Sequence, residues 1–439
     1  MMLYKKTKSK LMIEIAEEAK IKLRALPVGI VSQNKDANLV YEELEELCDL
    51  LRAINLIPLE PEIAKLHSVN SQYKTGTGKA AEIAQLAQEC EADCIVFDEP
   101  LTPSQQRNWE HLTKCACIDR EEVILDIFSD RAQTKEAVLQ VQLAKAKYSL
   151  PRLTRAWKHL SRQRGGGATN RGQGEAQLET DRRLLKRRIQ QLEEELSIVR
   201  KQRSTQRKAR LRRPVVQGAI VGYTNVGKSS LLKTLSGSEV MVKDQLFATL
   251  DPLARQLNIN GVDMVLTDTV GFVRKLPHSL VEAFKSTLEE AVLADFLLLV
   301  LDISSPQLDM EWETTLSVLK ELGADSKKIQ IVFNKCDNIN MEEDSILLAR
   351  LKSLFPDALY ISCATNYNID KLKNRLTQLA SINREIIKVI LPPNRHDLVA
   401  LVHSAGQIFE EEYQDNGDIH LVFTIETRHL NRFEPYIIR

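Results

Sequence analysis

The stretch GYTNVGKS, residues 222–229, fits the pattern G-x-x-x-x-G-K-[ST]. The apolar run Ala219-Ile220-Val221 before it predicts a β-strand, and Ser230-Leu231-Leu232 after it begins a helical pattern. A glycine-rich turn between a strand and a helix leaves free N–H groups at the helix N-terminus, where the helix dipole favours anions. The stretch therefore predicts a phosphate-binding loop in an α/β domain.

Each part of this loop has an expected task. Gly222 and Gly227 allow the backbone to approach a phosphate closely. We expect Lys228 to reach the β- and γ-phosphates as a catalytic residue and the Ser229 hydroxyl to bind Mg²⁺. The other loop residues expected to bind the nucleotide are Tyr223, Thr224, Asn225, Val226 and Ser230. An ordinary strand–turn–helix is the plainer interpretation, and the complete motif disfavours it.

A second motif, Asp268-Thr269-Val270-Gly271, follows the alternating strand from Val262 to Leu266. An Asp at a strand end can hold Mg²⁺ through water, and the Gly271 N–H can meet the γ-phosphate as a second catalytic group. A lone D-x-x-G pattern is a weak signal, but its place after the phosphate loop strengthens it. All four residues are expected to bind the nucleotide.

Between these motifs lies a candidate switch segment. Its residues Phe247, Ala248, Thr249, Leu250 and Asp251 are expected to contact the nucleotide. Thr249 is the expected third catalytic residue, because its hydroxyl would meet Mg²⁺ and its backbone would sense the γ-phosphate. A Thr in a loop usually has no such role, and only the order of the motifs favours it here.

Base selection is predicted from Asn334-Lys335-Cys336-Asp337, which follows the apolar strand from Ile329 to Phe333. A carboxylate accepts two hydrogen bonds from donors that point the same way, which guanine offers through N1–H and N2–H and adenine does not. Such a site can reject the wrong base by ~10⁴-fold or more. Ser362, Cys363 and Ala364 follow a short strand and would complete the base pocket through backbone N–H groups.

A catalytic group is missing from this set. Many GTP-hydrolysing switch proteins place a Gln directly after the D-x-x-G glycine to orient the attacking water. The position here is Phe272, whose ring cannot hydrogen-bond to water. We therefore expect slow hydrolysis without a partner that orders the switches or supplies a charged group.

The order of these five elements resembles the GTPase domain of translation-factor-related G proteins. The rest of the chain is similar to the HflX family of ribosome-associated GTPases, across roughly residues 25–380. This similarity is carried by GGGATNRGQGEAQLETDRR (165–183), LDIFSDRAQTKEAVLQVQLA (125–144), YKTGTGKAAEI (73–83) and TPSQQRN (102–108). The chain departs from the family pattern at Ala168-Thr169, at Gln173 and at Cys363; a Cys at the last position supplies the same backbone N–H.

Charge is strongly segregated along a chain whose formal net charge is zero. Residues 151–213 contain 19 Lys and Arg against 6 Asp and Glu. The residues expected to contact RNA are Arg152, Arg155, Lys158, Arg162, Arg164 and Arg171, with Trp157 and His159 interleaved for stacking. The plainer alternative is a solvated basic helix face, and a protein or an anionic membrane surface is a third possible partner.

The 439 residues exceed what one core usually organises. The expected fold class is α/β: a GTPase domain with a mostly parallel sheet, preceded by an α/β domain carrying a long antiparallel helical hairpin, and followed by a small α+β domain. The expected domains are residues 1–133, 134–213, 214–384 and 385–439. The first hairpin helix should span about 134–148, kink at Pro151 and resume towards His159. The second should span about 175–210, and a glycine-rich loop at 165–174 should join the two. In the last domain, Ile386–Leu391 and Ile419–Thr424 should be strands and His396–Glu411 a helix.

Composition limits the cellular setting. Seven scattered cysteines suit a reducing cytoplasm, and Cys115-Ala116-Cys117 is better explained by buried strand thiols than by a metal pair. The N-terminal residues lack the apolar segment of a signal peptide, and the longest apolar run is too short to span a membrane. Gly76-Thr77-Gly78-Lys79 precedes a helix; a helix-entry turn is favoured there, with ATP-driven RNA remodelling by the first domain as the alternative.

The resemblance implies a function. It suggests a cytoplasmic, monomeric GTPase that uses Mg²⁺, binds the large ribosomal subunit and its RNA in the GTP state, and hydrolyses GTP to GDP and phosphate. The family's implied role is the separation of stalled or idle ribosomes, notably under stress. A signalling or assembly GTPase with a basic hairpin remains an alternative from the residues alone.

Overall fold

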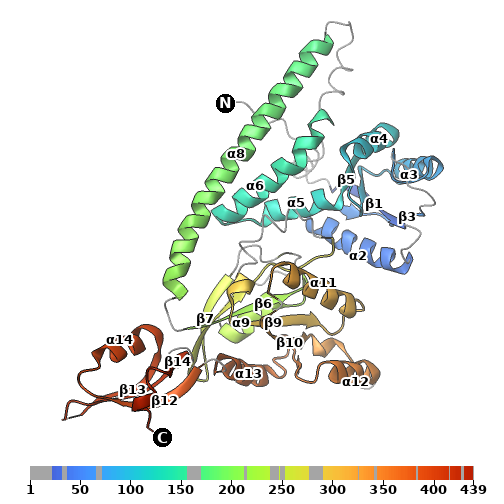
Figure 1. Cartoon of the computed structure of the whole chain (residues 1–439). Coiled ribbons are helices and arrows are strands. Elements are labelled where there is room, and N and C mark those ends of the chain that lie inside the picture. The colour runs from blue at the N-terminus through green and yellow to red at the C-terminus, as the bar shows by residue number, and fades with distance from the viewer. Residues whose placement is uncertain are drawn as a thin grey trace. The chain divides into compact units, whose positions relative to one another are not determined.

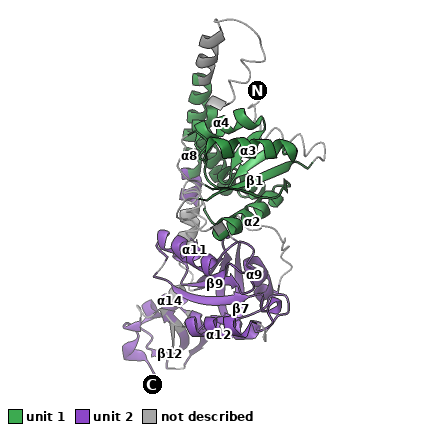
Figure 2. Ribbon diagram, turned by 90° about the vertical axis from the view of Figure 1, so that its right-hand side faces the viewer, with its two compact units in different colours: residues 1–196, 245–247, 274–284 green, residues 197–244, 248–273, 285–439 purple. Residues whose placement is uncertain are grey.

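The computed structural model forms two compact units (Figure 2). Unit 1 contains residues 1–196, 245–247 and 274–284, and unit 2 contains residues 197–244, 248–273 and 285–439. The structure describes residues 22–31, 37–65, 72–155, 170–211, 215–237, 247, 253–275, 290–324, 326–340, 344–381, 384–414, 416–426 and 430–438.

Unit 1 is built on a parallel sheet, as the alternation of apolar and helical segments predicts. Its path is β2-β1-β4-β5, and β3 also pairs with β1. The strands are β1 (Arg24–Val31), β2 (Ile57–Pro58), β3 (Glu62–Lys65), β4 (Cys94–Phe97) and β5 (Ala116–Asp119). All four residues of β4 are buried, because helices cover both faces of a parallel sheet.

Among the described residues, the helices that accompany this sheet are α2 (Ala37–Ala53), α3 (Thr77–Glu89), α4 (Pro103–Thr113) and α5 (Arg120–Arg131) (Figure 1). Helix α2 packs with α5, and α3 packs with α4. Helix α4 begins with a capping box between Thr102 and Gln105 followed by Pro103, which explains its sharp start. Asp119, the last residue of β5, accepts the Glu122 N–H and so caps α5.

The helical hairpin begins with α6 (Lys135–Ser149), capped by Thr134. A 3₁₀ helix, η1 (Leu150–Arg155), follows. The predicted kink is therefore wrong, because the α-helix ends at Ser149 and a tighter helix runs through Pro151. Helix α8 (Asn170–Leu211) has 42 residues and returns in the opposite direction to α6 (Figure 1). The predicted loop over residues 165–174 is therefore too long, since residues 170–174 are helical. Adding residues to an existing helix is easier than starting one, so the strong helix formers that follow outweigh the glycines.

Unit 2 contains a sheet of strand order β11-β10-β9-β6-β8-β7, parallel except for the edge pair β7 and β8. Its strands are β6 (Val216–Gly222), β7 (Leu253–Ile259), β8 (Val262–Asp268), β9 (Phe296–Asp302), β10 (Lys328–Asn334) and β11 (Leu359–Tyr360). The helices are α9 (Lys228–Ser236), α11 (Leu308–Glu321), η2 (Cys336–Asn338), α12 (Ser345–Leu354) and α13 (Ile369–Ser381). Strand β9, whose residues are buried except for Asp302 at its end, supplies the centre of the core.

The C-terminal part of unit 2 is a separate antiparallel sheet of order β12-β14-β13. It comprises β12 (Arg384–Leu391), α14 (His396–Ala405), β13 (Gln407–Tyr413), β14 (Ile419–Glu426) and η3 (Glu434–Tyr436). The predicted helix from His396 to Glu411 is wrong beyond Ala405. Gln407 onwards pairs with β14 across the Asn416-Gly417 turn, so tertiary pairing overrides the helical propensity of the Glu-rich run.

Within the described part of the chain, we find no helix long and apolar enough to cross a membrane.

Candidate nucleotide-binding site

The 222–229 loop connects β6 to α9 in unit 2, as the motif predicts. Gly227 is the N-cap of α9 and has φ 93°, a left-handed conformation that favours glycine. A Cβ at Gly227 would lie 2.3 Å from Asn334 Nδ2, so a side chain there would clash. The loop therefore keeps its shape through glycine and holds its backbone against the base-selection motif.

Lys228 is buried within this loop. Its Nζ donates hydrogen bonds to the carbonyl oxygens of Gly222 (3.1 Å) and Tyr223 (2.6 Å). Burial lowers the pKa of Lys228 to about 8, against the charges of Asp268 and Glu311, which raise it. The ammonium is thus poorly compensated, and a phosphate placed beside it would restore its positive charge.

Ser229 and Asp268 meet at the ends of α9 and β8. The Ser229 hydroxyl donates to Asp268 Oδ2 at 2.6 Å, and Asp268 is fully buried. A hydroxyl and a carboxylate are hard oxygen ligands of the kind that Mg²⁺ prefers. These two residues therefore fit a magnesium ion at the position that the sequence predicts.

The 268–271 motif continues β8 alongside the phosphate loop. The Thr269 hydroxyl donates to Ile220 O at 2.7 Å. Beyond the motif, the Phe272 N–H donates to Gly222 O (3.1 Å), and the Thr224 N–H donates to Phe272 O (2.9 Å). A Cβ on Gly271 would lie 2.9 Å from Lys228 Nζ, so the two groups are close neighbours.

Asn334 joins the phosphate loop to both base loops. Its side-chain amide donates to Val226 O (2.9 Å) and accepts from the Cys363 N–H (3.1 Å). Lys335 has φ 63° and forms an ion pair with Asp302 at 2.7 Å. Asp337 lies in η2 with its side chain exposed, so its carboxylate is accessible to a base.

The third base segment is ordered by its own turn. The Ser362 N–H donates to Tyr367 O (3.2 Å), and the Ser362 hydroxyl accepts from the Thr365 N–H (3.1 Å). Burial raises the pKa of the Cys336 and Cys363 thiols to about 11 and about 12, and Asp337 adds to both shifts. Both thiols are therefore neutral at ordinary pH, and we assign them packing roles beside the exposed Ala364.

Part of the predicted set is not placed by the structure. Ala248, Thr249, Leu250 and Asp251 lie outside the described residues. Phe247 is buried in unit 1, with its ring centroid 4.7 Å from that of Phe128.

Of the residues predicted to contact RNA, Arg152 has a side chain that the structure describes. Arg152 is 12% exposed and ion-pairs with Asp119 (3.4 Å). It also donates to Leu101 O (2.8 Å) and Gln106 Oε1 (3.1 Å), and its guanidinium lies over the Tyr148 ring. These partners hold the donors of Arg152 within unit 1, and its expected contact with RNA stays a prediction.

The structure does not describe the side chains of the other residues predicted to contact RNA. Lys158, Arg162 and Arg164, together with Trp157 and His159, lie outside the described residues. Arg155 ends η1, and Arg171 is in the first turn of α8.

The short Gly76–Lys79 sequence proves to be a helix entry. Gly76 is the N-cap of α3, and Lys79 forms ion pairs with Glu62 (2.8 Å) and Glu82 (3.1 Å). Its ammonium is thus neutralised by carboxylates, which disfavours a phosphate site there.

Sequence reasoning missed two acidic residues of the site, Asp302 and Glu311. Asp302 ends β9 and holds Lys335, and Glu311 lies on α11 near enough to raise the pKa of Lys228. Asp302 was detectable, because a carboxylate that ends a buried parallel strand lies at the edge where ligands bind. Glu311 follows no motif, and only the packing of α11 brings it to the site.

Three family profiles match the chain: "GTP-binding GTPase N-terminal" over residues 41–129, "GTP-binding GTPase Middle Region" over 131–210 and "50S ribosome-binding GTPase" over 217–335. The GTPase HflX of Akkermansia muciniphila is 45% identical over 97% of this chain and 99% of that protein. The GTPase HflX of Escherichia coli (strain K12) is 38% identical over 93% of this chain and 95% of that protein. The chain belongs to the GTPase HflX family.

Membership of the HflX family confirms the resemblance, the P-loop GTPase fold and the enzyme class that the sequence predicts. A crystal structure of a GTP-binding protein from the archaeon Sulfolobus solfataricus, in complex with GDP, is also similar. It aligns with 82% of this chain and 99% of that chain, at 26% identity and a TM-score of 0.43.

Proposed function

We propose that this chain binds the large ribosomal subunit in its GTP state and hydrolyses GTP to leave it, separating stalled or idle ribosomes under stress. The observation that carries the proposal is the "50S ribosome-binding GTPase" profile over residues 217–335. The profile covers the phosphate loop, the 268–271 motif and the first two residues of the base motif, Asn334 and Lys335. The protein would act as a monomer in the cytoplasm, where ribosomes are.

The site geometry supports the expected nucleotide contacts. The phosphates would take the amine of Lys228 from its two carbonyl partners, and the exposed carboxylate of Asp337 would accept two hydrogen bonds from guanine. Ser229 and Asp268 would hold Mg²⁺, which would neutralise charge on the phosphates. Thr249 is expected to join them, with Gly271 donating its N–H to the γ-phosphate.

Hydrolysis should be slow in the isolated protein. Phe272 occupies the place of the water-orienting Gln, and its ring is 1% exposed in the core. No side chain that can hydrogen-bond to water stands at this position. The ribosome would then order the switches or supply a charged group, an effect that can reach ~10³ to 10⁵ in rate.

Co-sedimentation with ribosomal subunits tests the proposal. We expect the chain to pellet with the large subunit in a non-hydrolysable GTP analogue, and much less in GDP or ATP. Single-turnover hydrolysis should accelerate when ribosomes are added, and associated ribosomes should separate into subunits on a sucrose gradient. Binding that ignores the nucleotide, or fast hydrolysis by the isolated protein, would contradict it.

Charge-removing substitutions test whether the basic residues around the glycine-rich loop bind the ribosome. Replacing Arg162, Arg164 and Arg171 with Ala should weaken ribosome binding and reduce its salt dependence by ~0.7 to 0.9 for each lost phosphate contact. GTP affinity should stay the same. A matched control replaces three exposed arginines of α8 (Arg182, Arg183 and Arg187), removing the same charge away from the tip. An equal loss in both variants would argue for general charge attraction.

A further inference from the structure

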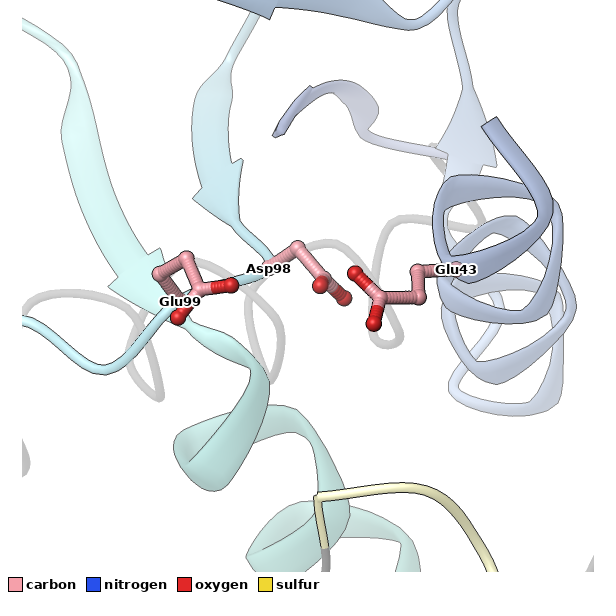
Figure 3. A group of neighbouring side chains, drawn as sticks. All are labelled: Glu43, Asp98 and Glu99. Atoms are coloured by element: carbon pink, nitrogen blue, oxygen red, sulfur yellow. The ribbon is translucent and has the colours of Figure 1, made fainter. Parts of the chain in front are cut away.

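The chain crosses from unit 2 to unit 1 between Val273 and Arg274, directly after the nucleotide-sensing motif. Lys275 then enters a group of carboxylates on α2 and at the end of β4. Its Nζ lies 2.9 Å from Glu43 Oε2 and 2.8 Å from Glu99 Oε1, and it also contacts the buried carboxylate of Asp98. Figure 3 shows these three carboxylates together, with those of Glu43 and Asp98 facing each other.

The three carboxylates are close enough to hold a cation. Ligand oxygens of Glu43, Asp98 and Glu99 all lie within 4.8 Å of one another. In this structure the cation is the ammonium of Lys275. Burial would lower the pKa of Lys275, but the charge of Asp98 and hydrogen bonds to Asp98 and Glu99 raise it above its usual range. Lys275 is therefore charged and is a specific partner of this cluster.

Arg274 is held beside Lys275. Its side chain is 5% exposed and lies 3.7 Å from Glu46 and 3.6 Å from Glu42, and its backbone N–H donates to Glu46 Oε1 at 3.4 Å. Arg120, on α5, pairs with two of these carboxylates, Asp98 and Glu46 (2.8 Å). Five carboxylates thus surround three cations, two of which come from residues 274–275.

The same segment is also tied to the phosphate loop in unit 2. Phe272 exchanges two backbone hydrogen bonds with Gly222 and Thr224, and Gly271 closely approaches Lys228. To bind a γ-phosphate, Lys228 must leave its carbonyl partners and an oxygen must fit between it and Gly271. Any movement of residues 271–272 that makes room for this oxygen is restrained, because Arg274 and Lys275 are held only two and three residues after Phe272.

We propose that Arg274 and Lys275 are positioning residues, and that their ion pairs with Glu43, Glu46, Asp98 and Glu99 form a charge clamp that opposes the rearrangement required by GTP. This proposal rests on the proposed GTP site. Because linkage is reciprocal, bound GTP weakens the clamp by the same factor by which the clamp weakens GTP binding. GDP, which lacks the γ-phosphate, leaves the clamp closed.

The clamp is tested by nucleotide affinities of the full chain. Lys275→Ala should bind a non-hydrolysable GTP analogue roughly 5-fold more tightly while its GDP affinity changes less than about twofold, in line with typical coupling energies. Glu99→Gln is the milder variant. Glu99 is 24% exposed, so this substitution should not unfold the protein. Glu99→Gln should shift the ratio of GTP-analogue affinity to GDP affinity in the same direction. The double variant should add little to Lys275→Ala, because both substitutions break the same Lys275–Glu99 contact.

Lys373→Ala is the matched control, because it removes a partly exposed lysine that pairs with Asp370 at 3.4 Å. It should leave both affinities as in the wild type. An unchanged or reduced GTP-to-GDP preference in Lys275→Ala and Glu99→Gln, with thermal melting intact, would overturn the clamp. If the wild type bound neither guanine nucleotide, the proposed function itself would fail, so the two failures are distinguishable.

Discussion

Nucleotide binding should make this protein take up a proton. Burial lowers the pKa of Lys228 to about 8, so about half of the molecules carry a neutral amine at pH 8. Phosphate charge beside the amine favours its charged form and raises its pKa again. We therefore expect uptake of about 0.5 proton per GDP bound at pH 8 and about 0.1 at pH 7.

Titration calorimetry measures this uptake. GDP with Mg²⁺ is titrated at pH 8 in two buffers of different ionisation enthalpy, and the difference in apparent binding enthalpy gives the number of protons. The sign is fixed by the direction of the shift: a lowered pKa in the free protein gives uptake on binding, and affinity falls as pH rises above about 8, approaching tenfold per unit.

A neighbouring carboxylate provides the specific test. The charge of Glu311 raises the pKa of Lys228, so Glu311→Gln should lower it further and increase proton uptake at pH 8. Glu313→Gln is the control, since it removes the same charge from an exposed position on the same helix, α11. Uptake near zero at pH 8, or equal uptake in the two variants, would refute the assignment of the titrating group to Lys228.

Two further substitutions test structural roles. Asn334→Ala removes one buried and one half-buried hydrogen bond between the phosphate loop and the base loops, worth about 1–3 kcal/mol together, and should weaken GDP binding in a fluorescence titration. The exposed Asn258→Ala should not do so, and equal affinities would argue against the bridge. Arg152→Ala leaves buried Asp119 poorly compensated and should cost about 2–4 kcal/mol in urea unfolding. Ribosome affinity of its folded fraction should be unchanged, and a loss of affinity without a loss of stability would instead support Arg152 as an RNA contact.

The nucleotide loops could be placed from sequence because their determinants are local. A glycine between a buried strand and a helix start fixes the loop at Gly227, and the carboxyl ends of parallel strands bring Asp268 and Asn334 to the same edge of the sheet. This placement of Asp268 and Asn334 requires only that the strands are parallel, and not their order in the sheet. The same logic applies to Thr134, whose side chain caps α6 where a helix was expected.

What sequence could not supply is the choice of partner for a charged side chain. Arg152 belongs to a run of basic residues. Such a run gives the net charge of a segment but not the partner of each side chain, and its side chains are usually solvated. The fold instead places it over Tyr148 and beside Asp119, which is a buried partner from another element. The strand from Gln407 was missed for a related reason, because pairing with β14 cannot be read from a Glu-rich segment alone.

Lys275 shows how such partner choices bear on function. Its position is set by the sensing motif, four residues after Gly271, yet its three carboxylate partners come from α2 and the end of β4. A surface pair would contribute little, but Asp98 is 1% exposed, so moving Lys275 away would leave a buried charge less well compensated. Arg120 still pairs with Asp98, so the charge is never left alone and the energetic difference between the two arrangements stays moderate. A moderate difference is what a switch requires, because a ligand can shift an equilibrium only by its differential affinity for the two states.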